Sequence, residues 1–193
     1  DILFVPVDDK TVNMPVRRVH KSSAHPDESE LKEAAKIINN AQKPLFIGGS
    51  GVRMSACQDV LKTFIEKTGF PFVLLNNGRG GLPDSHPLSI NDGGFTGIMT
   101  GAPQADVIVA AGVRFNWVMQ ATKMFPDAKV VRIDIREDEI DRNRSSEVGL
   151  VGDCGYVLSQ LSPMVDKRDH GQWLKKLKNV YAAFLTTDQI GRA

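Results

Sequence analysis

The sequence predicts an α/β fold, in which a doubly wound parallel sheet of five or six strands carries helices on both faces. Short apolar runs alternate along the chain with segments of helical periodicity, as in sheets built from βαβ units. The runs are continuous rather than alternating, which is typical of strands buried on both faces. The first of them leads into a glycine cluster, as a strand does in Rossmann-like folds. We therefore expect a Rossmann-like sheet with strands at residues 44–47, 70–75, 107–111, 129–133 and 148–151.

The composition is that of a globular protein with one core. Of 193 residues, 41% are hydrophobic and 24% are charged, which is enough to build one domain. The formal net charge of +1 gives no electrostatic reason to expect a nucleic acid or an anionic membrane as partner. No apolar run approaches the roughly 18 residues that a membrane-spanning helix needs. Cys57 and Cys154 have no metal-ligand spacing, and they fit the reduced thiols of a cytoplasmic protein.

The first part of the chain looks like the end of one domain and the start of another. Residues 1–7 are apolar and strand-like, and residues 8–26 are polar and proline-containing, as in a linker. The chain does not begin with methionine, so we expect a piece of a longer protein. Asp27 and Glu30 form a capping pair, and the apolar positions after them predict a helix to about Asn40.

A glycine cluster follows the first predicted strand. Gly48, Gly49, Ser50 and Gly51 precede a helical pattern, so a phosphate could approach the backbone and the first amides of the helix. The spacing is not that of the G-x-G-x-x-G fingerprint, because position 54 is Met, and the lysine of a P-loop is missing. A tight turn that simply requires small residues explains the cluster equally well.

Turn-rich segments separate the remaining elements. The helix after the first glycine cluster should end at Gly69, and residues 76–87 form a long segment of the kind that carries sites in α/β proteins. A second glycine cluster, 91–97, precedes a short helix, and residues 116–124 also look helical. The acidic residues of 135–142 predict the start of a solvated helix.

Two further helices and a tail complete the chain. The first contains Val157, Leu158, Leu161 and Met164. The second is amphipathic from Trp173 to Phe184, and the tail is expected to fray.

The predicted strand ends carry residues suited to binding rather than to bond-making. Arg114 could bind phosphate, and Asp134 and Asp153 could accept hydrogen bonds from a ribose or an adenine. No Ser-His-Asp order, paired carboxylates or Cys/His cluster stands out, so we predict neither a catalytic residue nor a metal ligand. Alternatively, Arg114 and Asp134 form ion pairs with neighbouring chain segments.

Five segments occur in the order and spacing of a known family, and they cover residues 27 to about 165. They resemble the central domain of thiamine diphosphate-dependent enzymes, in the group of acetolactate synthase, benzaldehyde lyase, oxalyl-CoA decarboxylase and 2-hydroxyacyl-CoA lyase. The resemblance implies that 1–26 end a pyrimidine-binding domain and form a linker. It also implies that 27–165 are the central Rossmann-like domain, and that 166–193 are a helical extension toward a diphosphate-binding domain. The segments are KPLFIGGSGV, FPFVLLNNGRGGLPDSHPLS, ADVIVAAGVRF, KVVRIDIREDEIDRN and VGLVGD.

The resemblance also implies partners and ligands. In that family the domain makes subunit contacts and packs the catalytic domains, so we expect the enzyme's own other domains and a homo-oligomer, dimer or tetramer, as partners. It holds FAD in acetolactate synthases and ADP in oxalyl-CoA decarboxylase, whereas benzaldehyde lyase keeps the fold without FAD. By this resemblance and the strand-end positions, the expected cofactor-binding residues are Gly49, Ser50, Gly51, Gly94, Arg114, Phe115, Asp134, Ile135 and Asp153.

The resemblance places the catalytic apparatus outside this chain. The family's activating glutamate belongs to the pyrimidine-binding domain, and its Mg²⁺ and diphosphate motif, Gly-Asp-Gly followed by Asn-Asn, belongs to the third domain. Gly152-Asp153-Cys154-Gly155 imitates that motif, but Cys154 replaces a glycine. We therefore expect no activity from the chain alone. In the intact lyase or transferase, thiamine diphosphate would act as ylid and electron sink in making or breaking a bond beside a carbonyl.

Three other hypotheses are open. An FAD-binding module of the electron-transfer-flavoprotein type would have a similar sheet, and its bound flavin would be photoreducible. A purely structural, dimerising domain would have an empty cleft. The segment GSGVRMSA loosely echoes the first glycine loop of sirtuin deacetylases, but the zinc cysteines of that family are missing.

Overall fold

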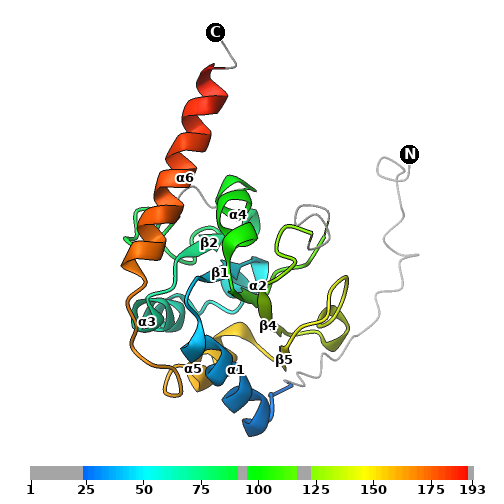
Figure 1. Cartoon of the computed structure of the whole chain (residues 1–193). Coiled ribbons are helices and arrows are strands. Elements are labelled where there is room, and N and C mark those ends of the chain that lie inside the picture. Colours follow the sequence, from blue (N-terminus) through cyan, green and yellow to red (C-terminus); the bar gives the residue numbers. More distant parts are fainter. Residues whose placement is uncertain (1–23, 91–94, 117–122, 191–193) are drawn as a thin grey trace, which may run out of the picture.

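A five-stranded parallel sheet forms the centre of the molecule (Figure 1). The structure is a computed structural model, and it describes residues 24–90, 95–116 and 123–190. The strands lie in the order β2-β1-β3-β4-β5, and every neighbouring pair is parallel. The predicted doubly wound sheet is thus confirmed, with strands β1 (Pro44–Gly48), β2 (Phe72–Leu74), β3 (Val107–Ala111), β4 (Lys129–Asp134) and β5 (Val148–Val151).

Helices cover both faces of the sheet, and a hydrophobic cluster lies under each layer (Figure 1). Successive side chains of a strand point to opposite faces, so Phe46 enters one cluster while Leu45 and Ile47 enter the other. The first cluster is covered by α1 (Glu28–Asn40), α3 (Gln58–Thr68) and α5 (Cys154–Leu161). The second is covered by α4 (Phe95–Gly101) and α6 (Gly171–Ile190).

Helix α1 begins as its sequence predicts. The backbone N–H of Asp27 donates to Glu30 Oε2 at 2.8 Å, which satisfies one of the amides that a helix start leaves unpaired. The apolar face of the helix, with Leu31 and Ile38, is buried in the first cluster. The capping residues and one apolar stripe are therefore sufficient to predict this helix from the sequence.

The helix predicted after the first glycine cluster is divided in two. A short α2 (Ser50–Met54) is followed by α3, and Ala56 between them has a positive φ of 50°. The turn buries Cys57, whose thiol donates to the backbone oxygen of Val52 at 3.4 Å. Gly69, with φ of 67°, ends α3 as expected.

The solvated helix predicted for residues 135–142 is wrong. This segment contains only a 3₁₀ turn, η6 (Glu137–Glu139), and Glu139 is 3% exposed. The acids do not share one solvated face, because Glu139 is buried in contact with Arg114, Arg132 and Arg142. Met164 also lies beyond the end of α5. The expectations for residues 1–23, for Gly94 and for a helix over 117–122 fall outside the described residues.

Helix α6 joins the domain through its first turns and then extends away from the sheet (Figure 1). Trp173 and Leu177 are buried in the second cluster, and Trp173 Nε1 donates to the backbone oxygen of Pro44 at 2.8 Å. The domain boundary at residue 165 stays a prediction. Among the helices described, none combines the length and apolar character needed to cross a membrane.

Candidate functional site: a pocket at the carboxyl ends of the strands

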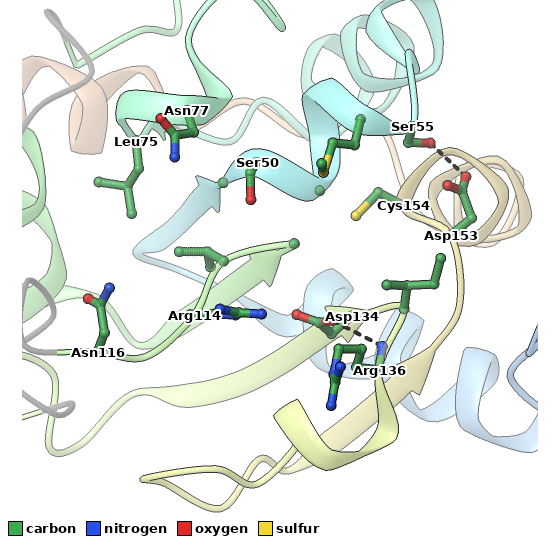
Figure 2. A pocket seen from close by; sticks show the side chains of 16 residues that line it. Ser50, Ser55, Leu75, Asn77, Arg114, Asn116, Asp134, Arg136, Asp153 and Cys154 are labelled. Carbon is green, nitrogen blue, oxygen red and sulfur yellow. Dashed lines mark hydrogen bonds between the residues drawn. The ribbon is translucent and has the colours of Figure 1, made fainter. Parts of the chain in front are cut away.

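A pocket of about 630 Å³ opens at the carboxyl ends of β1, β3, β4 and β5 (Figure 2). The chain runs from β1 to β2 on one side and then crosses back to β3 on the other side of β1, so the gap between β1 and β3 is a topological switch point. Open α/β sheets bind their ligands at such points. Each strand end contributes to the lining, through residues 49–51, 112–114, 134–136 and 153–154.

Close approach of two turns explains the glycines at this pocket. Gly51 N donates to the backbone oxygen of Gly112 at 3.0 Å, and a Cβ on Gly51 would lie 2.6 Å from the Cα of Gly112. Gly112 has φ of 56°, which favours glycine. The tight-turn explanation therefore accounts for Gly49, Gly51 and Gly112, and the same contact forms a wall of the pocket.

Asp134 is a buried carboxylate that faces the pocket. It is 7% exposed, and its Oδ1 accepts the backbone N–H of Arg136 at 3.1 Å. Burial raises the pKa of the Asp134 carboxyl, although that hydrogen bond and the charge of Arg132 act in the opposite direction. The carboxylate is thus costly to keep charged, as acids at functional sites often are.

Arg114 supplies a cation to the same pocket. Its side chain is 68% exposed, and Figure 2 shows it extending toward Asp134. Its Nε lies 3.5 Å from Oε1 of Glu139, so the ion pair expected with a neighbouring segment is present. The guanidinium of Arg136 is bound to its neighbour Asp138, with Nε 2.8 Å from Oδ1. Arg114 is therefore the less committed of these two arginines.

Asp153 caps helix α5. Its Oδ1 accepts from Ser55 Oγ at 2.6 Å and from the backbone N–H groups of Gly155 and Tyr156 at 2.9 and 3.2 Å. One carboxylate oxygen is therefore committed to the fold. A ligand contact by Asp153 stays a prediction.

Most of the predicted cofactor-binding residues line the pocket. Ile135 is 63% exposed at its rim, whereas Phe115 is buried and packs against Arg132 and Phe125. Gly94 lies outside the described residues. The predicted residues that the structure brings together are Gly49, Ser50, Gly51, Arg114, Asp134, Ile135 and Asp153.

The other lining residues were not predicted from the sequence as ligand contacts. Arg136 could have been found, because it is a basic residue that follows directly after a strand end. Asn77 belongs to the turn-rich segment that was expected to carry a site. Met54, which is 86% exposed at the rim, offered no signal. The remaining lining residues are Ser55, Leu75, Gly112, Val113, Asn116 and Cys154.

The described residues do not fit magnesium and the diphosphate of thiamine diphosphate. No group of His, Cys, Asp and Glu in the described part of the chain could hold a metal ion. Asp153 is a helix cap, and burial raises the pKa of the Cys154 thiol to about 12, so Cys154 is a neutral group. We therefore assign no step of thiamine chemistry to this site.

The comparisons with known proteins agree with the fold and also identify a protein family. The chain matches the family described as thiamine pyrophosphate enzyme, central domain, over residues 31–161. An acetolactate synthase of Mycobacterium bovis is 32% identical over 151 residues, which are 76% of this chain and 24% of the relative. A 2-hydroxyacyl-CoA lyase of Arabidopsis thaliana is 33% identical over 137 residues, which are 69% of this chain and 23% of the relative.

A solved structure shows the same architecture. The crystal structure of benzoylformate decarboxylase from Polynucleobacter necessarius superposes with a TM-score of 0.65 at 19% identity, over 84% of this chain and 32% of that one. At this identity the likeness concerns the fold. The chain spans about a quarter of the length of the relatives named above. The family match and its extent lead to one conclusion: this chain belongs to the thiamine pyrophosphate enzymes, as a central domain.

Proposed function

We propose that the chain is the central domain of an enzyme that makes or breaks a carbon–carbon bond beside a carbonyl, of the acetolactate synthase or 2-hydroxyacyl-CoA lyase type. We further propose that its pocket holds the ADP portion of a nucleotide, either ADP itself or FAD. The single observation behind the ligand is that Arg114 and Asp134 share one pocket at the switch point of the sheet.

The two side chains divide the ligand between them. A guanidinium forms charge-assisted hydrogen bonds with phosphate oxygens, which suits Arg114. A carboxylate at a strand end accepts hydrogen bonds from ribose hydroxyls. This suits Asp134, because the backbone N–H of Arg136 uses only its Oδ1, and its Oδ2 can accept a bond from the ribose. The pocket volume of about 630 Å³ is in the range of small-molecule sites. The nucleotide would contribute binding and orientation here rather than chemistry.

The rest of the proposal concerns the whole enzyme. Thiamine diphosphate and magnesium would be held by the pyrimidine- and diphosphate-binding domains of the same enzyme, as the resemblance implies. Those domains and further copies of the enzyme would be the partners of this one. A cytoplasmic location stays a prediction from the sequence.

A purely structural domain is the second candidate, and one observation favours it. Several lining groups already serve the fold: Gly51 and Gly112 pack backbone to backbone, and Asp153 caps α5. If the residues at the strand ends serve only to stabilise the fold, the pocket would hold no nucleotide.

Titration of the chain with ADP and with FAD separates the two candidates. We expect micromolar or tighter binding, and about tenfold weaker binding in Asp134→Asn, since a charge-assisted hydrogen bond contributes about 1.5–3 kcal/mol. Asp166→Asn is the matched control, because Asp166 is exposed and does not line the pocket. Absence of binding to either nucleotide would support the structural candidate. Photoreducible bound flavin would support the electron-transfer-flavoprotein alternative.

A further inference from the structure

One buried carboxylate beside the pocket is surrounded by arginines. Glu139 is 3% exposed at the end of η6. Its Oε1 lies 2.8 Å from Arg142 Nη1 and 3.5 Å from Arg114 Nε, and its Oε2 lies 3.7 Å from Arg132 Nη2. A carboxylate is buried only at high cost unless charged partners satisfy it. The arrangement therefore makes Glu139 the common partner of three cations.

Arg132 anchors Glu139 from the core. It is fully buried, and its guanidinium lies 4.0 Å from the centre of the Phe115 ring. Nη1 donates to the backbone oxygen of Arg142 at 3.2 Å, and Nη2 donates to that of Val113 at 3.4 Å. The segment after β3 is thereby tied to the segment after β4. Displacing Glu139 would remove one of the carboxylates that compensate this buried charge, alongside Asp134 and Asp141.

Arg114 approaches Glu139 from the pocket. The shortest contact is from its Nε to Oε1 at 3.5 Å, and within the described residues its two terminal nitrogens make no hydrogen bond. An arginine presents five N–H donors in a planar fork. A guanidinium held at Nε keeps the edge formed by Nη1 and Nη2 available in one orientation, and that edge can bind two phosphate oxygens at once.

We propose that Glu139 is a positioning residue for anion recognition, which holds Arg114 so that its terminal nitrogens face a nucleoside diphosphate in the pocket. This inference rests on the proposed function, because the ligand is the same ADP group. It adds that the affinity depends on a side chain that does not line the pocket. Without Glu139, the exposed Arg114 side chain would have to be ordered by the ligand at the expense of binding.

The test is a double-mutant cycle with ADP as the probe, with folding of each variant checked by thermal unfolding. We expect Arg114→Gln to weaken ADP binding about tenfold and Glu139→Gln about fivefold. In the Arg114→Gln background, adding Glu139→Gln should change the affinity by less than about twofold, because the only route of its effect is gone. Arg142→Gln is the matched control: it removes the 2.8 Å contact to the same carboxylate from a residue outside the pocket lining. It should lower the melting temperature and leave the ADP affinity unchanged.

A second variant keeps the inference testable if Glu139→Gln does not fold. Arg114→Lys changes an exposed side chain and keeps its charge, but a lysine cannot contact Glu139 and also offer a second pair of nitrogens. It should weaken ADP binding nearly as much as Arg114→Gln. Wild-type affinity in Arg114→Lys, or equal weakening by Glu139→Gln and Arg142→Gln, would overturn the positioning role while leaving the nucleotide site intact. Failure of the wild-type chain to bind ADP would overturn both.

Discussion

At the scale of single residues, the pocket combines groups whose environments oppose their charge. Asp134 is nearly buried beside Arg132, and Cys154 is a buried thiol at the start of α5. In both cases burial disfavours the ionised form and raises the pKa. For Asp134, the raised pKa means that the charged carboxylate destabilises the fold, as is common at binding sites. For Cys154, it means that the reactive thiolate does not form. Each case leads to a measurable expectation.

The raised pKa of Asp134 gives a pH-dependent stability. Because its folded-state pKa lies above the ordinary value of 3.8, its contribution to stability is present below that value and is lost as the pH rises through the folded pKa. At pH 7, Asp134→Asn should therefore be more stable than the wild type, by about 1 kcal/mol. The advantage should shrink as the pH falls toward 4 in urea unfolding. An advantage that is constant with pH would contradict the assignment to ionisation.

The buried thiols should be unreactive in the folded chain. The nucleophile is the thiolate, and burial raises the pKa of Cys154 to about 12 and also raises that of Cys57. Labelling with a thiol reagent at pH 8 should be at least about a hundredfold slower in buffer than in concentrated urea. Rapid labelling of Cys154 in buffer would show that the start of α5 opens in the folded state.

At the scale of elements, the turns after β1 and β3 behave as one unit. Gly112 has φ of 56°, and a Cβ there would clash with the backbone of Gly51. Gly80 has φ of 90° with no atom within 4 Å of such a Cβ, so it isolates the conformational cost alone. Contact between these two turns continues the pairing of β1 and β3 beyond the last residues of the strands and up to the pocket.

Replacing the two glycines should separate the clash from the backbone cost. Gly80→Ala should lower the free energy of unfolding by about 1–2 kcal/mol, the cost of a left-handed conformation. Gly112→Ala should cost at least about 2 kcal/mol more, since backbone must also move. Urea unfolding measures both. Equal costs would mean that the turns can separate freely.

At the scale of the whole molecule, the first turns of α6 complete the second face of the sheet. Trp173 is 6% exposed, and its indole N–H bonds to Pro44 at the start of the central strand. Trp173→Ala should therefore cost about 3–5 kcal/mol in urea unfolding, as for other large buried aromatics. Lys175→Ala, on the exposed side of the same helix, should change it by less than about 0.5 kcal/mol. A small effect of Trp173→Ala would make α6 an appendage rather than part of the domain.

Local features were recognisable without the structure because their causes lie close together in the chain. The start of α1 depends on Asp27 and Glu30, and the end of α3 depends on Gly69. The continuous apolar runs marked all five strands, since burial on both faces of a parallel sheet leaves no polar alternation. Arg114 and Asp134 were predicted as ligand contacts because both lie at strand ends, and both line the pocket.

Distant contacts decided what local patterns could not reveal. The break at Ala56 accompanies the burial of Cys57. The acidic segment after β4 forms only a 3₁₀ turn, in which Arg114 and Arg132 from other segments, and Arg142 from the same segment, contact Glu139. Asp153 looked like a ligand contact, and the structure uses it to cap α5 and to bind Ser55. The hydrogen bond from Ser55 to Asp153 and the contacts of Arg114 and Arg132 with Glu139 join distant segments, so spacing along the chain carries no trace of them.

The parallel sheet, the order of its elements and the family resemblance were all predictable from the amino-acid sequence. They depend on periodicity, turn residues and strand-end glycines, which are patterns of residues close together in the chain. The tertiary structure alone decided which strand-end groups line the pocket and which of them also serve the fold. The reason is physical: the availability of Arg114 and Asp134 depends on burial and on charges such as Glu139 and Arg132, and these are set by packing between separate segments.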